Sequence, residues 1–205
     1  MVRRAFFPGR KLNSFVAIQQ WFKQSDGNPF YSCVFDGNIP GLCSWSVSKD
    51  GDILFGGAYK AKNCRQSFEK QKQTLASCGF EFGLPLKTES CLVIRPRLRD
   101  GFCLGQEGVF LLGEAAGFIS PSSLEGISWA LNSAMLLAKV LTDSKDPQAA
   151  YQKATRGLRF KLFLKMLKCP FLYRPWLRWL VMKSGMKAIT LCNQEAQGQQ
   201  NALPM

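Results

Sequence analysis

The clearest pattern of hydrophobic and polar residues is a strict alternation over Leu42 to Lys49, in which three apolar residues alternate with three serines. A period of two predicts a β-strand with one apolar and one polar face. Residues 49–52, Lys-Asp-Gly-Asp, have the composition of a hairpin turn, and Ile53 to Tyr59 is predicted to be the returning strand. Two earlier apolar runs, Phe15 to Phe22 and Phe30 to Phe35, are also predicted strands. The first part of the chain is therefore expected to form an antiparallel sheet.

A helix is predicted from Cys64 to Cys78, because Phe68 and Leu75 fall on one helical face. Charged residues are expected on the outside, namely Glu69, Lys70 and Lys72. Gly79 comes next as a natural C-terminal residue, since glycine readily adopts the left-handed conformation. A strand-like run from Thr88 to Ile94 lies further along the chain.

The segment from Gly108 to Leu141 is the one around which the chain is expected to be organised. Val109 to Leu112 suits a short buried strand, and Gly113 to Gly117 would form a loop of small residues. Proline and serine at 121–123 offer a rigid turn and N-cap candidates. Apolar residues then recur at helical spacing: Ile127, Ala130, Leu131, Ala134, Leu137, Ala138 and Leu141. A strand, a small-residue loop and a helix start can bring backbone N–H groups to an anionic or electron-rich ligand, although tight packing is an equal explanation of small residues.

Residues 111–131, LLGEAAGFISPSSLEGISWAL, resemble the second flavin-binding motif of the geranylgeranyl reductase-like FAD-dependent oxidoreductases, within the wider hydroxylase-type flavoprotein superfamily. In that family a strand leads into Gly-Asp-Ala-Ala-Gly, then Pro, and then a Gly-Glu-Gly-Ile type entry into a helix. The resemblance covers about twenty near-contiguous positions and implies that FAD is the cofactor.

The resemblance implies roles for the small-residue loop. Gly113 and Glu114 stand where the family's Gly-Asp holds the ribityl chain and the ribose side of FAD, although glutamate is one methylene longer than aspartate. Ala115, Ala116 and Gly117 occupy positions that leave room for the pyrophosphate and the ribityl chain.

The resemblance also assigns the turn and the helix start. Pro121 would shape the turn beside the isoalloxazine ring. Gly126 and Ile127 would bring backbone N–H groups to N1 and the C2 carbonyl of the flavin, where a helix dipole stabilises the negative charge of the reduced ring. Glu125 is interpreted as an acid serving the same helix dipole and not as a catalytic group. We name no catalytic residue.

Two candidates for substrate binding lie outside this motif. The segment CSWSVSKDGDILFGG, residues 43–57, resembles the family pattern Tyr-x-Trp-x-Phe-Pro followed by glycine, but only Trp45, Gly56 and Gly57 match. Trp45 is therefore a candidate for contact with a hydrophobic, isoprenoid-like substrate, and a core position is the alternative. Arg95, in the Arg-Pro-Arg of residues 95–97, is a candidate to face the flavin or an acidic substrate, with an exposed turn residue as the alternative.

The expected fold class is α+β, as in the C-terminal part of a Rossmann-type flavoprotein. We expect an antiparallel substrate-binding sheet with one helix over 1–107, a FAD-contacting strand, loop and helix over 108–142, a basic aromatic-rich helical region over 143–192, and a flexible tail over 193–205. The N-terminal G-x-G-x-x-G turn of a complete FAD enzyme is not found in this sequence. Met1-Val2-Arg3-Arg4 instead resembles a point after the family's internal Asp-Gly motif. We therefore expect a partial chain whose partner would be a missing N-terminal Rossmann half.

Composition narrows the chemistry. The chain has no histidine, so Ser-His-Asp catalysis, Cys-His catalysis and His-ligated metal sites are excluded. Its eight cysteines include no C-x-x-C pair, so no metal site is expected. No apolar signal region comes after the first residues and no run approaches the length of a membrane span, so a reducing, cytoplasmic setting is expected.

The C-terminal region is strongly basic, and the whole chain carries a net charge of +13. No acidic residue lies between Asp146 and Glu195, whereas Lys and Arg occur there ten times among Phe, Tyr and Trp. A helix is predicted to begin at Pro147 with Asp146 as its cap, and Pro170 and Pro175 are predicted to break this helical region into short pieces. Three interpretations stand: peripheral binding to an anionic membrane, a helical cap over the substrate cavity, and, least favoured, nucleic-acid binding.

The sequence thus favours a FAD-dependent oxidoreductase that moves hydride to or from a hydrophobic substrate and is reduced by an external donor. A non-catalytic fragment, a membrane-surface binding module, and a flavin monooxygenase or halogenase are the alternatives.

Overall fold

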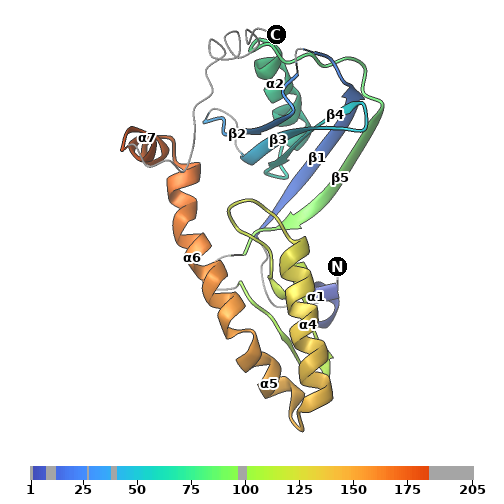
Figure 1. The fold of residues 1–205 in the computed structure, drawn as a ribbon, viewed down its shortest axis with the longest axis vertical. Coiled ribbons are helices and arrows are strands. Elements are labelled where there is room, and N and C mark those ends of the chain that lie inside the picture. Colours follow the sequence, from blue (N-terminus) through green and yellow to red (C-terminus); the bar gives the residue numbers. More distant parts are fainter. Residues whose placement is uncertain (1, 8–12, 27, 38–40, 97–100, 185–205) are drawn as a thin grey trace, which may run out of the picture. The chain divides into compact units, whose positions relative to one another are not determined.

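The computed structural model describes residues 2–7, 13–26, 28–37, 41–96 and 101–184 (Figure 1). The chain divides into two compact units, Met1–Cys169 and Pro170–Met205. The first unit holds a five-stranded antiparallel sheet in the order β2-β3-β4-β1-β5 and a two-stranded ribbon formed by β6 and β7. The expected α+β class with an antiparallel sheet is confirmed.

The sheet agrees closely with the predicted strands. Its members are β1 (Ser14–Lys23), β2 (Tyr31–Val34), β3 (Gly41–Lys49), β4 (Asp52–Tyr59) and β5 (Lys87–Ile94). A short helix, α1 (Val2–Phe6), precedes the sheet, and α2 (Cys64–Ala76) connects β4 to β5. Asp50 and Gly51 both have positive φ angles, as a tight hairpin between β3 and β4 requires.

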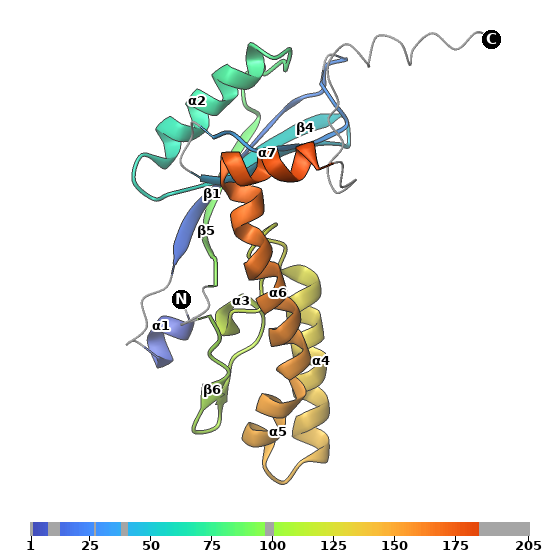
Figure 2. The ribbon, with the colours of Figure 1, turned by 90° about the vertical axis from the view of Figure 1, so that its left-hand side faces the viewer.

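Helix α2 covers one face of the sheet (Figure 2). The core between them is apolar and aromatic, with Phe22, Phe55 and Phe68 almost completely buried. The predicted inward positions Phe68 and Leu75 are confirmed. Gly79 has φ +92°, which turns the chain so that the Phe80 N–H donates to the Leu75 carbonyl.

The prediction for Lys72 is wrong, because its side chain does not point out into water. Its ammonium donates to Gln20 Oε1 at 2.8 Å and lies 5.4 Å from the ring centroid of Phe22 and 5.5 Å from that of Phe68. The long aliphatic stem of lysine allows this position while the ammonium stays paired with Glu69 at 3.0 Å.

The serine face of β3 is the more surprising part of the sheet. Ser44 and Ser46 are buried, because they share the α2-facing side with Phe55 and Tyr59 of the neighbouring strand. Ser44 Oγ donates to Gln71 Oε1 of α2, and the Tyr59 hydroxyl donates to the same oxygen. Burial raises the pKa of Tyr59, so this phenol stays protonated as a donor. The serines are therefore satisfied by a buried network and do not mark a solvent face.

The second cluster of the first unit is built by β6 (Gly105–Gln106), β7 (Val109–Phe110), α3 (Gly113–Ala116), α4 (Ile127–Asp143), α5 (Pro147–Ala154) and α6 (Arg156–Tyr173). Its buried residues include Leu111, Phe118, Leu137, Tyr151 and Leu162. The strand predicted over 109–112 is shorter than expected, since only two residues pair with β6. The predicted small-residue loop is in fact one helical turn, α3, followed by Gly117.

Helix α4 turns most of its predicted apolar repeat toward solvent. Its buried residues are Ser133, Leu137 and Val140, whereas Ile127, Leu131 and Met135 are 78%, 61% and 71% exposed. The repeat does have helical spacing, but the helix is apolar around most of its circumference, so spacing alone did not identify the core-facing side.

The predicted helix cap and helix breaks of the C-terminal region are confirmed only in part. Asp146 caps α5 as predicted, since its carboxylate accepts from the Ala149 N–H at 3.1 Å. Pro175 begins α7 (Pro175–Lys183), but Pro170 lies inside α6 and does not end it. Of the helices in the described ranges, none has both the length and the hydrophobicity needed to cross a bilayer.

Candidate functional site

The candidate site is built on α3, the loop after it and the first turn of α4. Gly113 opens α3 with φ +55°, and its N–H donates to Ser133 Oγ of α4 at 2.9 Å. A Cβ on Gly113 would stand 3.1 Å from the Cβ of Ala130. The hydrogen bond and the missing side chain together allow α3 and α4 to approach closely.

The end of α3 depends on Gly117. Gly117 has φ +92°, and Phe118 N–H donates back to the Gly113 carbonyl at 2.8 Å. A Cβ on Gly117 would lie 2.0 Å from the carbonyl oxygen of Gly101. Ala116 is fully buried, and its carbonyl accepts from the Cys103 N–H. The backbone of α3 is therefore packed directly against the segment that precedes β6.

Glu114 connects this turn to the sheet. Its Oε1 accepts from the backbone N–H of Ile94, the last residue of β5, at 2.6 Å. Neighbouring Ala115 is half-buried. A charged acceptor on a backbone N–H is among the stronger neutral-donor hydrogen bonds, so Glu114 fixes the end of β5 against α3.

Arg95 provides a second connection from the sheet to the same region. Its Nε donates to the carbonyl of Pro121 at 2.9 Å, and its backbone N–H donates to the Asn13 carbonyl. Arg95 is half-buried and Pro121 is buried. Arg95 is thus held by the turn before α4.

Residues 120–125 form a closed turn leading into α4. Ser120 is fully buried, its N–H donates to the Glu125 carbonyl, and its hydroxyl accepts from the Ser123 hydroxyl at 2.8 Å. Leu124 has φ +58°, a conformation that bulky residues rarely adopt. Contrary to the N-cap candidates at 121–123, the N-cap of α4 is Gly126.

The first turn of α4 is open. Gly126 has φ −123°, and a Cβ there would meet only Ile119 at the ordinary distances of 3.7 and 3.8 Å. Ile127, the next residue, is highly exposed. Glu125 Oε1 accepts from the N–H and the hydroxyl of Ser128 at 2.9 and 2.7 Å. Burial alone would raise the pKa of Glu125, but these hydrogen bonds lower it, so its charge complements the positive end of the helix.

Ser133 gives a test of the α3–α4 connection. Ser133→Ala is expected to lower the free energy of unfolding by about 1–3 kcal/mol, since the buried Gly113 N–H would lose its acceptor. Urea unfolding measures the change. Thr142→Ala is the matched control, because Thr142 makes a comparable hydroxyl-to-carbonyl bond on the exposed side of the same helix. Equal effects in the two variants would show that Gly113 does not depend on Ser133.

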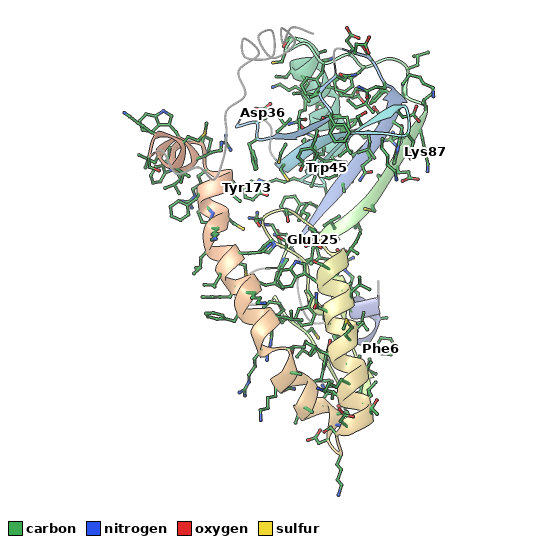
Figure 3. The ribbon with its side chains drawn as sticks, in the orientation of Figure 1. Phe6, Asp36, Trp45, Lys87, Glu125 and Tyr173 are labelled. Atoms are coloured by element: carbon green, nitrogen blue, oxygen red, sulfur yellow. The ribbon has the colours of Figure 1, made fainter. Side chains whose placement is uncertain are left out.

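Trp45 lies on the sheet face opposite α2 (Figure 3). A Cβ on Gly56, its partner on β4, would stand 2.9 Å from two atoms of the Trp45 indole and 2.8 Å from Gln19 Cγ. The indole therefore lies against the bare backbone of Gly56. Trp45 is half-buried, so part of its side chain is accessible and it is not enclosed in the core under α2.

Comparison with known proteins places the fold. The chain's structure is similar to a geranylgeranyl bacteriochlorophyll reductase-like protein from Thermoplasma acidophilum, with a TM-score of 0.68, 18% identity, and coverage of 89% of this chain and 50% of that one. A tryptophan 6-halogenase from Streptomyces toxytricini matches with a TM-score of 0.51 and 14% identity, over 98% of this chain and 35% of that one. The chain thus shares its α+β fold with these two proteins.

A closer relative is found by sequence. Protein CbrA of Escherichia coli O157:H7 is 48% identical over 192 residues, which cover 92% of this chain and 54% of that protein. The chain therefore spans about half the length of the curated relatives it matches. A comparison with models of known protein families finds no match.

Sequence reasoning did not find Ser133 or Ser120, which hold the site's backbone together. A serine within an apolar helix was the available indication for Ser133, because a buried hydroxyl needs a partner. Nothing local to residues 120–125 predicts that Leu124 has a positive φ.

Proposed function

We propose that this chain forms part of a FAD site in a flavin-dependent oxidoreductase. The observation that carries the proposal is the open first turn of α4, where Gly126 has space for a Cβ and Ile127 is exposed at the start of a 17-residue helix. Backbone N–H groups at such a position favour an electron-rich or anionic group. The Ser128 N–H and hydroxyl already donate to Glu125. Gly126 and Ile127 are therefore the residues proposed to contact the flavin ring.

The other motif residues are proposed to shape the site. Gly113 and Gly117 are proposed to act through packing, because a Cβ on either would meet Ala130 or Gly101. The short side chains of Ala115 and Ala116 are proposed to leave room for the cofactor's phosphates and ribityl chain, and Pro121 to set the turn. Glu114 and Arg95 are proposed to act by position, because Glu114 already holds the end of β5 against α3 and Arg95 already bonds the turn before α4. This differs from a carboxylate that binds the ribityl chain with both oxygens available.

When bound, FAD would supply hydride transfer at its N5 atom, which no side chain of this chain can provide. The protein's own contribution is to bind and orient the ring and to keep water away. The half-buried Trp45 indole, which lies against the bare backbone of Gly56, offers a flat aromatic contact for an apolar substrate. We propose a hydrophobic, isoprenoid-like substrate on this face. Hydroxylation and halogenation are the alternative reactions, since halogenases share the fold.

A further part of the site is proposed to come from a Rossmann-type half. The curated relatives are about twice as long as the matched region. Helix α4 exposes Ile127, Leu131 and Met135, which lie four residues apart on one apolar stripe beginning at the proposed flavin contact. Burying that stripe under a second half would join the two parts beside the cofactor.

FAD retention tests the proposal. After incubation with FAD and desalting, the chain is expected to keep the two visible absorption bands of bound flavin, with quenched flavin fluorescence. The same measurement on the E. coli CbrA protein is the control for the second half. Flavin held by the longer protein and not by this chain would assign most of the affinity to the other half. Absence of flavin from both would contradict the proposal and favour a non-catalytic role.

A further inference from the structure

Helix α7 exposes an apolar surface to solvent. Trp176 and Trp179 are 59% and 57% exposed, and Leu180 is 47% exposed. At 100° per residue these three side chains fall in one arc of about 140°, together with Pro175 and Lys183. The opposite side of the helix, which holds Leu177, Val181 and Met182, is only partly exposed. The helix thus has apolar residues on both sides, and the side with both tryptophans is the more exposed one.

Basic groups lie at both ends of this surface. The Lys183 ammonium lies 4.8 Å from the ring centroid of Trp179, and Arg174 is exposed at the N-cap. Arg178 donates to the Leu172 carbonyl at 2.9 Å, which ties α7 to the end of α6. Phe171, just before, is 48% exposed. The described part of this unit, residues 170–184, contains no aspartate or glutamate.

We infer that residues 171–183 form a docking surface for an anionic phospholipid bilayer, with Trp176, Trp179 and Leu180 entering the interface. Tryptophan is the side chain that most favours the boundary between headgroups and acyl chains, because its ring is apolar and its N–H remains hydrogen-bonded. Lysine and arginine at the edges of such a face pair with anionic headgroups. The combination of exposed tryptophans, basic edges and no acid matches a bilayer better than a protein, whose interface would offer partners of both signs.

The inference does not depend on the flavin proposal, because every residue it uses lies in the second unit. It requires two properties of binding. The apolar contact should persist in moderate salt, whereas the contribution of Arg174 and Lys183 should weaken as salt is raised. Vesicles without anionic lipid should bind much less well.

Co-sedimentation of the purified chain with vesicles tests this. With vesicles of phosphatidylcholine and phosphatidylglycerol, the chain is expected to pellet, and its tryptophan emission should shift to the blue. Trp176→Ala combined with Trp179→Ala is expected to reduce partitioning at least about tenfold. Lys183→Glu should reduce it less, and only at low salt. Circular dichroism checks that the variants keep their helix content.

Matched controls remove an exposed aromatic residue and an exposed charge from the sheet region. Phe30 is 78% exposed and Lys60 is exposed, so Phe30→Ala and Lys60→Glu make similar chemical changes far from α7 in the sequence. Both should pellet as the wild type does. The inference is overturned if the wild type stays in the supernatant, if it pellets equally with phosphatidylcholine alone, or if the tryptophan variants match the controls. Tryptophan-dependent self-association or nucleic-acid binding without vesicle binding would likewise overturn it.

Discussion

Replacing Gly117 by alanine is expected to lower the free energy of unfolding by about 2–4 kcal/mol. Two causes act together. The φ angle of +92° is strained for any residue with a Cβ, and the added atom would lie 2.0 Å from the carbonyl oxygen of Gly101 and 3.0 Å from its carbon. Those neighbours are backbone atoms, so no side chain can rotate away to relieve the contact. Urea unfolding followed by circular dichroism measures the change.

Gly83 provides the control for this variant. No heavy atom lies within 4 Å of a Cβ placed there, and its φ is outside the left-handed region. Gly83→Ala should change stability by less than about 0.5 kcal/mol. Gly113→Ala should fall between the two, because its φ is positive but its nearest contact is a methyl group at 3.1 Å. If Gly117→Ala were as stable as Gly83→Ala, the close contact between Gly117 and the Gly101 carbonyl would be contradicted.

The sheet could be predicted from sequence because each strand carries its own local evidence. Alternation in β3, the Asp-Gly turn and the return through β4 identify a hairpin without knowledge of the rest of the fold. The helix α2 was equally clear, since Phe68 and Leu75 share one face of a mostly polar helix. In both cases neighbouring residues contain the information.

The side of an element that faces the core was harder to predict. Ser44 and Ser46 are buried because Gln71 and Tyr59, distant in sequence, supply their partners or neighbours. Ile127 and Leu131 are exposed although they are apolar. Polarity predicts burial only when the rest of the core is known, because a buried hydroxyl with a partner costs little and an exposed apolar residue is common.

The candidate site, too, could be predicted from the sequence only in part. Its motif could be identified from residues 111–131 alone, but the contacts that hold it could not. Glu114 bonds to Ile94 and Arg95 bonds to Pro121, and both pairs join segments at least 20 residues apart.

The structure also distinguishes two kinds of glycine in the motif. Gly117 and Gly113 are explained by backbone conformation and packing, whereas Gly126 has an allowed φ and room for a side chain. The fold does not require glycine at 126.

Gly126→Val is therefore expected to reduce FAD affinity at least tenfold, about 1.4 kcal/mol, while leaving the free energy of unfolding within about 1 kcal/mol of wild type. A Cβ at this position meets only Ile119 at 3.7 Å, so the folded chain should tolerate it. The branched side chain would instead occupy the open space at the start of α4, where the flavin ring is proposed to approach. Titration with FAD, followed by fluorescence quenching, measures the affinity.

Gly157→Val is the matched control, because a Cβ on Gly157 would have no heavy atom within 4 Å and the residue lies near the start of another helix, α6. It should leave both stability and FAD affinity unchanged. Unchanged affinity in Gly126→Val would refute the assignment of the α4 turn to the flavin. A loss of stability as large as that of Gly117→Ala would instead show that the fold requires glycine at 126. The resemblance of residues 111–131 to a flavin motif would then be explained by packing and not by flavin binding. The two measurements together thus separate a glycine kept for the fold from one kept for a ligand.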